Sequence, residues 1–149
     1  MGKRDENREE LRRRLLDTAE RHIAEQGLAS LKAREVTAEA GVALGSIYNA
    51  FENLDLLILH VNARTLARLN ETLAAVAHEG LDPAAKMVAL ARGYVRFALE
   101  NHRLWAALFD HRLPEGVEVP EWHREAHVEI MRLIARPLAQ LRPDLTQEQ

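Results

Sequence analysis

Proline, the strongest breaker of helices, is rare in this chain of 149 residues and is confined to positions 83, 114, 120, 137 and 143. Long helices are therefore permitted between these positions. Apolar residues recur at helical spacing, as in the series Leu11, Leu15, Ala19 and Ile23. No segment reads convincingly as a strand. These patterns predict an all-α fold.

The overall composition excludes several classes of protein. The chain contains no cysteine, which rules out disulfides and thiolate metal sites and fits a reducing compartment. We find neither a signal-type leader nor an apolar run of about 18 residues, so we expect a soluble, cytoplasmic protein without a membrane partner. The net charge of −3 argues against a generally basic nucleic-acid binder. Residues 1–34 nevertheless carry nine Lys/Arg against seven Asp/Glu, a net charge of +2.

In the first part of the chain we expect three helices, at about residues 6–26, 31–40 and 44–50. Gly27 is predicted to end the first helix in a left-handed conformation, and Ser30 to cap the second. The two short helices are separated by a very tight turn. Such a spacing is typical of a helix-turn-helix, in which the second helix of the pair enters the DNA major groove.

The later helices are predicted by their start and stop signals. A long helix begins at Asn53 or Asp55 and runs to about residue 79. Asp82 followed by Pro83 is a strong start signal for the next helix. The remaining expected elements are helices at about 83–101, 102–112 and 121–140, with a loop at 113–120. Thr146 to Gln149 match a capping box, so a further helix is expected to begin there and the chain to be incomplete at its C-terminus.

Two glycines four residues apart, Gly41 and Gly45, occur in the stretch "AGVALGSIYNAF" (40–51). Gly41 lies between the two short helices, where a tight turn needs a positive φ. Gly45 lies at the start of the third helix, where a side chain would hold the backbone away from DNA. Tyr48 is expected on the exposed face of that helix, and Phe51 in the core.

Residues 27–51, followed by "LDLLILHV" (54–61), resemble the DNA-binding domain of TetR-family transcriptional regulators. The family signature A-G-V-x-x-G-[ST]-[ILV]-Y-x-x-F is matched at Ala40, Gly41, Val42, Gly45, Ser46, Ile47, Tyr48 and Phe51. The segments "NARTLARLNETL" (62–73) and "YVRFALENHRLWAALFDHRLP" (94–114) resemble, more loosely, the C-terminal regulatory domain of one subgroup. The resemblance implies a DNA-binding domain at residues 1–53 and a helical ligand-binding and dimerisation bundle at 54–149, which we expect to be incomplete at its end.

Transferred by position, the resemblance implies a set of DNA-binding residues. Lys3, Arg4 and Arg8 would form an N-terminal arm, and Lys32 and Arg34 would flank the second helix. The residues facing the major groove would be Leu44, Gly45, Ser46, Tyr48 and Asn49. Family members often carry Lys at the positions of Leu44 and Leu54, so we expect modest affinity or a shallow salt dependence. Asn49 either reads adenine or only meets solvent or phosphate.

Large and adaptable side chains gather beyond residue 90 and are candidates to line a ligand pocket. They are Tyr94, Phe97, His102, Trp105, Phe109, Trp122, His123, His127 and Met131. Plain core or dimer packing is the alternative for each of them. His123 and His127 are spaced i, i+4, as metal ligands on a helix can be, but surface histidines are the default and we expect no metal or other cofactor. No catalytic constellation is present, so we do not expect an enzyme.

The resemblance implies a homodimeric, ligand-responsive repressor, with a pseudo-palindromic DNA operator and a small-molecule effector as its partners. The helix at 54–79 is then the lever between the two domains. Three alternatives stay open. They are an activator of the same fold, a helical sensor or adaptor with weak or lost DNA binding, and a metalloregulator that uses His123 and His127.

Overall fold

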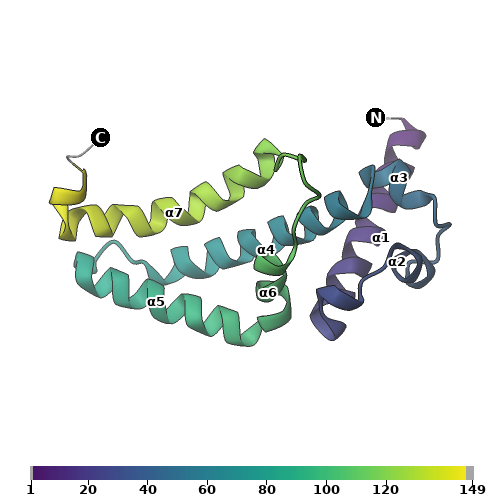
Figure 1. Ribbon diagram of the computed structural model, residues 1–149. Coiled ribbons are helices and arrows are strands. Elements are labelled where there is room, and N and C mark those ends of the chain that lie inside the picture. Colours follow the sequence, from purple (N-terminus) through teal and green to yellow (C-terminus); the bar gives the residue numbers. More distant parts are fainter. Residues whose placement is uncertain (1, 147–149) are drawn as a thin grey trace. The chain divides into compact units, whose positions relative to one another are not determined.

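The structure, a computed structural model, describes residues 2–146 (Figure 1). This part of the chain is helical, without a strand, which confirms the all-α prediction. Its α-helices are α1 (Lys3–Gln26), α2 (Ala33–Glu39), α3 (Ser46–Phe51), α4 (Leu54–Val76), α5 (Pro83–Glu100), α6 (His102–Asp110) and α7 (Glu121–Leu141). Two 3-10 helices span Leu28–Ser30 and Pro143–Thr146. The predicted capping box extends to residues 147–149, which lie outside the described residues.

The chain forms two compact units. The first unit comprises Met1–Ala63 and Arg103–Glu118, and the second comprises Arg64–His102 and Val119–Gln149. α4 therefore contributes to both units, and α6 belongs with the N-terminal helices. The expected boundary between a DNA-binding domain that ends at residue 53 and a ligand-binding domain that begins at residue 54 is a functional division, and it stays a prediction.

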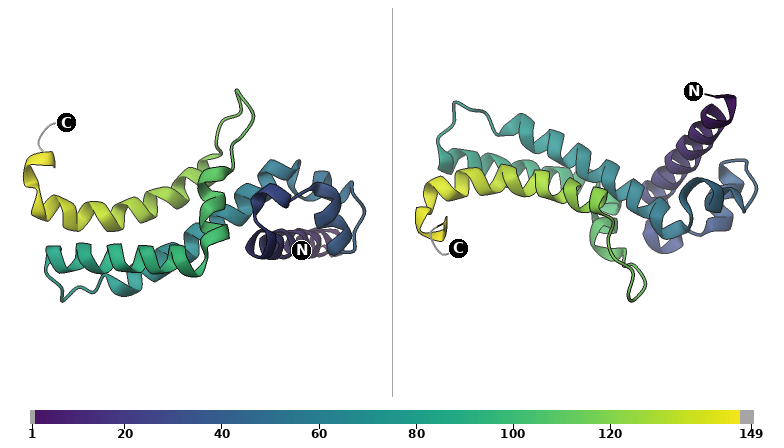
Figure 2. Two further views of the ribbon diagram at one scale, coloured as in Figure 1. Left: turned by 60° about the horizontal axis from the view of Figure 1, so that its bottom comes forward. Right: turned by 90° about the horizontal axis from the view of Figure 1, so that it is seen from above.

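The core of the first unit is built by the apolar stripe of α1. Leu15, Ala19 and Ile23 have no exposed surface, as their spacing of four residues predicts for one face of a helix. They pack in one cluster with residues from the other helices of this unit: Val36, Ile47, Phe51, Leu57, Val61, Leu104 and Ala107. This cluster holds the two short helices α2 and α3, which lie near α1 (Figure 2).

The connection between α1 and α2 differs from the prediction. Gly27 ends α1 with the expected positive φ of 88°, but its ψ of 164° lies outside the left-handed helical region. Ser30 does not cap α2. It lies in the 3-10 helix and donates a hydrogen bond of 3.0 Å to the carbonyl of Gly27, so its hydroxyl is used before α2 begins. The N-cap of α2 is Lys32, which makes no side-chain capping hydrogen bond.

Two later helix starts follow from local caps. Of the two candidates for the start of α4, Asn53 is correct, because its Oδ1 accepts a hydrogen bond of 2.8 Å from the amide of Leu56. Asp82 caps α5 as predicted and accepts a hydrogen bond of 3.0 Å from the amide of Ala85. α4 ends at Val76, before the predicted residue 79.

In the second unit, α5 and α7 lie side by side (Figures 1 and 2). The buried apolar residues come from α4, α5 and α7: Leu66, Leu69, Leu73, Leu90, Phe97 and Ile130. None of the helices described for this chain is long and apolar enough to cross a membrane.

Candidate nucleic-acid interface

The turn between α2 and α3 is closed by backbone hydrogen bonds. The amide of Val42 donates to the carbonyl of Thr37 at 2.9 Å, and the amide of Ser46 donates to the carbonyl of Ala43 at 2.9 Å. Gly41 has the predicted positive φ, 68°. The two helices therefore form the helix-turn-helix that the sequence predicted.

The short helix α3 has one buried face and one exposed face. Ile47, Ala50 and Phe51 are at most 3% exposed. Tyr48 is 64% exposed, and Asn49 is also exposed. The buried residues fix α3 on the core, so the exposed face is free to meet a partner.

The start of α3 is also open to solvent. Leu44 is 47% exposed, and Ser46 is partly buried. A Cβ placed on Gly45 would meet no atom of the protein within 4 Å, and its φ of −65° suits any residue. Among the described residues, no contact explains glycine at this position, and the close approach of DNA stays a prediction.

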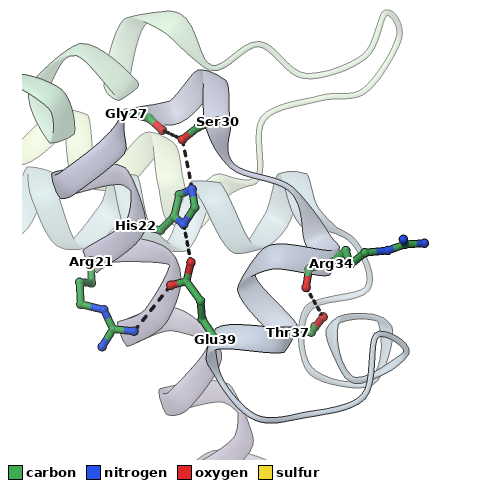
Figure 3. Close-up of polar contacts among 7 residues, drawn as sticks. All are labelled: Arg21, His22, Gly27, Ser30, Arg34, Thr37 and Glu39. Carbon is green, nitrogen blue, oxygen red and sulfur yellow. Dashed lines mark hydrogen bonds and ion pairs between the residues drawn. The ribbon is translucent and has the colours of Figure 1, made fainter.

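The five cations predicted to contact DNA are all exposed: Lys3, Arg4, Arg8, Lys32 and Arg34. α1 begins at Lys3 rather than at about residue 6, so Lys3 and Arg4 lie in the first turn of a helix and not in an extended arm. Figure 3 shows the guanidinium of Arg34 pointing away from the polar contacts between α1 and α2.

The basic run Arg12-Arg13-Arg14 does not form one cationic face. Arg12 donates a hydrogen bond to the carbonyl of Ala50 in α3, and Arg14 donates one of 2.6 Å to the carbonyl of Ala40 at the end of α2. Arg13 is exposed and pairs with Glu10. No such role of Arg12 and Arg14 was predicted from the sequence. The one sequence feature that could have indicated these contacts is the position of both arginines next to the apolar stripe of α1.

A buried histidine joins α1 to α2 (Figure 3). His22 is 3% exposed; its Nδ1 lies 2.9 Å from Oε1 of Glu39 and its Nε2 lies 3.1 Å from Oγ of Ser30. The hydroxyl proton of Ser30 is used on Gly27, so the serine oxygen accepts from Nε2. Arg21 lies 3.7 Å from the other oxygen of Glu39. The sequence offered no pattern that assigned this role to His22.

Models of two families match the chain and together cover most of it. Residues 15–61 match the family described as "Bacterial regulatory proteins, tetR family", and residues 87–149 match "Tetracyclin repressor-like, C-terminal domain". The chain belongs to the TetR family. As a TetR-family regulator it is a DNA-binding transcriptional regulator, and the helix-turn-helix lies within the first matched region.

Solved structures show the same fold. A protein with unknown function from Rhodococcus sp. RHA1 is 29% identical, with a TM-score of 0.71 over 88% of this chain and 68% of that chain. A TetR family transcription regulator from Marinobacter aquaeolei VT8 is 17% identical, with a TM-score of 0.66 over 97% of this chain and 73% of that chain. No curated protein matches the sequence of this TetR-family chain.

The predicted ligand-binding residues of this TetR-family protein are divided between the two units. Trp105 and Phe109 are on α6 in the first unit, where their ring centroids lie 5.0 Å apart. The second unit contains the others: Tyr94, Phe97, His102, Trp122, His123, His127 and Met131. Phe97 and His123 are buried, whereas Met131 is 60% exposed. A surface depression on α5 has none of the predicted residues in its lining, which consists of Ala91, Arg92, Val95, Arg96, Leu99 and Glu100.

The histidine pair on α7 forms a ring contact. The rings of His123 and His127 meet edge to face, with their centroids 5.1 Å apart. Among residues 2–146, no group of three or more His, Asp or Glu side chains is placed to hold a metal ion.

Proposed function

We propose that this TetR-family protein is a ligand-responsive repressor that binds a pseudo-palindromic operator as a dimer. The observation that carries the proposal is the exposed face of α3, where Tyr48 and Asn49 project next to the open backbone at Gly45. A recognition helix needs such a face, because side chains must reach base edges while the backbone comes close to the phosphates.

In this proposal α3 enters the major groove, and the cations around it hold the DNA backbone. Tyr48 contacts a phosphate, and Lys32 and Arg34 bind phosphates beside α2. Lys3, Arg4 and Arg8 do the same from the first turns of α1. Leu44 contributes apolar contact in place of a cation, which lowers the number of counterions that binding releases.

The effector is an unidentified small molecule bound in the second unit. It acts only if its affinity differs between the DNA-binding and non-binding arrangements of the protein. α4 is the candidate lever, because its residues belong to both units. An unchanged distance between spin labels on the two recognition helices, with and without inducer, would refute the lever.

The first experiment is a selection of random double-stranded DNA on the purified protein at two salt concentrations, read by sequencing. A palindromic motif supports a specific dimeric regulator. Sequence-independent, salt-sensitive recovery, or no recovery, refutes it.

A matched pair of variants then tests the phosphate contacts. Arg34→Gln removes a charge beside α2, and Arg132→Gln removes one from an exposed position on α7. We expect Arg34→Gln to reduce the slope of log K against log[salt] by about 0.9, the value for one phosphate contact. Arg132→Gln should leave the slope unchanged. If both variants have the same slope of log K against log[salt], Arg34 does not contact a phosphate.

A sensor or adaptor with weak DNA binding is the second candidate. It is favoured by the exposed apolar side chain of Leu44, where a phosphate-binding cation is often found in the family. If this candidate is correct, the wild type binds no DNA specifically, while its thermal unfolding still responds to an effector. Leu44→Lys should then increase the affinity for DNA.

A further inference from the structure

Two arginines of α1 reach the C-terminal ends of both helices in the helix-turn-helix. Arg14 donates to the carbonyl of Ala40, the C-cap residue of α2, and Arg12 donates to the carbonyl of Ala50, in the last turn of α3. Within residues 2–146, neither carbonyl accepts a hydrogen bond from a backbone amide outside its own helix. The last carbonyls of a helix lack partners within the helix, and a cation interacts favourably with that end of the helix dipole. The two guanidinium groups therefore supply partners that the backbone does not.

Arg12 makes two further contacts at this junction. Its guanidinium lies over the ring of Phe51, 4.3 Å from the centroid, and its Nη2 lies 3.4 Å from Nε2 of His60 in α4. A guanidinium can only donate, so Nε2 of His60 is the acceptor. The rings of Phe51 and His60 also contact each other, with their centroids 5.3 Å apart. One half-buried side chain of α1 thus joins the end of α3 to α4.

The helix held in this way is very short. α3 spans six residues, Ser46–Phe51, and its N-terminal end has no side-chain cap. A helix of this length is not stable in isolation, so its position depends on the contacts that attach it to the unit. Ile47 and Phe51 provide the apolar attachment, and Arg12 provides the polar attachment at the C-terminal end.

We propose that Arg12 is a positioning residue for DNA recognition, which acts by holding the end of α3 and without touching DNA. The inference rests on the proposed function, in which α3 reads the operator. Base contacts depend on the placement of the recognition helix, so a loosened α3 end should weaken specific binding more than non-specific binding.

The test compares Arg12→Met with Arg13→Met. Both variants remove one positive charge from neighbouring positions of α1, but Arg13 is exposed and pairs with Glu10. Binding to the selected operator and to a scrambled duplex is measured by fluorescence anisotropy at several salt concentrations. The temperature is set where circular dichroism shows both variants folded. Arg12→Lys, which keeps the charge and a donor, is the conservative variant.

We expect Arg12→Met to bind the operator about 10-fold more weakly than Arg13→Met, the loss that corresponds to one unmade, partly buried hydrogen bond. Its salt slope should equal that of the wild type, and Arg12→Lys should recover part of the affinity. A slope reduced by about 0.9 would instead place Arg12 on a phosphate and overturn the proposal. Equal affinity of the two methionine variants would overturn it as well.

Hydrogen exchange without DNA separates this proposal from the proposed function. In Arg12→Met the amides of Asn49, Ala50 and Phe51 should exchange about 10-fold faster than in Arg13→Met, with unchanged protection of Ile23 in α1. Unchanged exchange in α3, or an equal loss of protection throughout the unit, would overturn the positioning role. If the wild type binds no DNA, the proposed function fails and the exchange measurement alone decides whether Arg12 holds α3.

Discussion

The turn of the helix-turn-helix gives a prediction whose magnitude follows from the backbone. Gly41 has a φ of 68°, and a residue with a Cβ is strained there by roughly 1–2 kcal/mol. The added Cβ would lie 3.5 Å from Nη2 of Arg14, which is ordinary contact, so no clash adds to this cost. We therefore expect Gly41→Ala to lower the free energy of unfolding of the first unit by about 1–2 kcal/mol.

Gly45→Ala is the matched control. Gly45 has a φ of −65°, and its Cβ would meet nothing within 4 Å. The free energy of unfolding should therefore change by no more than about 0.5 kcal/mol. Gly45→Ala should weaken DNA binding more than Gly41→Ala does, because the Cβ at position 45 would stand between α3 and the DNA backbone.

Urea unfolding followed by circular dichroism measures the stability of both variants, and fluorescence anisotropy measures their DNA binding. If Gly41→Ala and Gly45→Ala unfold at the same urea concentration, the positive φ at position 41 does not carry the expected strain. If Gly45→Ala binds the operator as tightly as the wild type, DNA does not come close to the backbone at position 45.

Three further changes test other parts of the structure. Burial lowers the pKa of His111, and the nearby Asp55 only partly opposes this shift. The folded chain therefore holds fewer protons on His111 than the unfolded chain does, and stability should fall as the pH drops below about 6.5. The free energy of unfolding in urea is measured at about pH 5.5 and about pH 7.5, one value below and one above the ordinary histidine pKa. The difference between the two free energies should be smaller for His111→Gln than for the wild type. Asp82→Ala should destabilise the second unit by about 1 kcal/mol, with faster hydrogen exchange at Ala85, whereas Asp82→Asn should retain most of the cap. Phe51→Ala should cost about 3–5 kcal/mol in urea unfolding, because Phe51 is 3% exposed; a cost below about 1 kcal/mol would contradict its place in the core.

Much of the fold could be predicted because its signals are local. The start of α5 follows from Asp82 and Pro83, and the turn before α3 from Gly41, since a cap or a positive φ involves only neighbouring residues. The core face of α1 follows from a spacing of four residues. Ser30 shows the limit of such reasoning, because a serine near a helix start has more than one possible partner within three residues.

The candidate interface was predictable to the same extent. Tyr48 is exposed and Phe51 is buried, as their places in α3 required. The DNA and ligand roles of the predicted residues stay predictions. For the ligand residues the sequence could not show that Trp105 and Phe109 belong to a different compact unit from Phe97, because grouping depends on contacts between helices.

The sequence by itself thus determined the helices, the cap of α5, the helix-turn-helix and the family. Only the tertiary structure decided the use of Arg12, Arg14 and His22. Their partners lie 38, 26 and 17 residues away along the chain, at Ala50, Ala40 and Glu39. In the sequence an arginine next to an apolar stripe looks the same whether it meets solvent, phosphate or a carbonyl. The choice is made when packing of the apolar residues brings the unpaired ends of α2 and α3 within its reach.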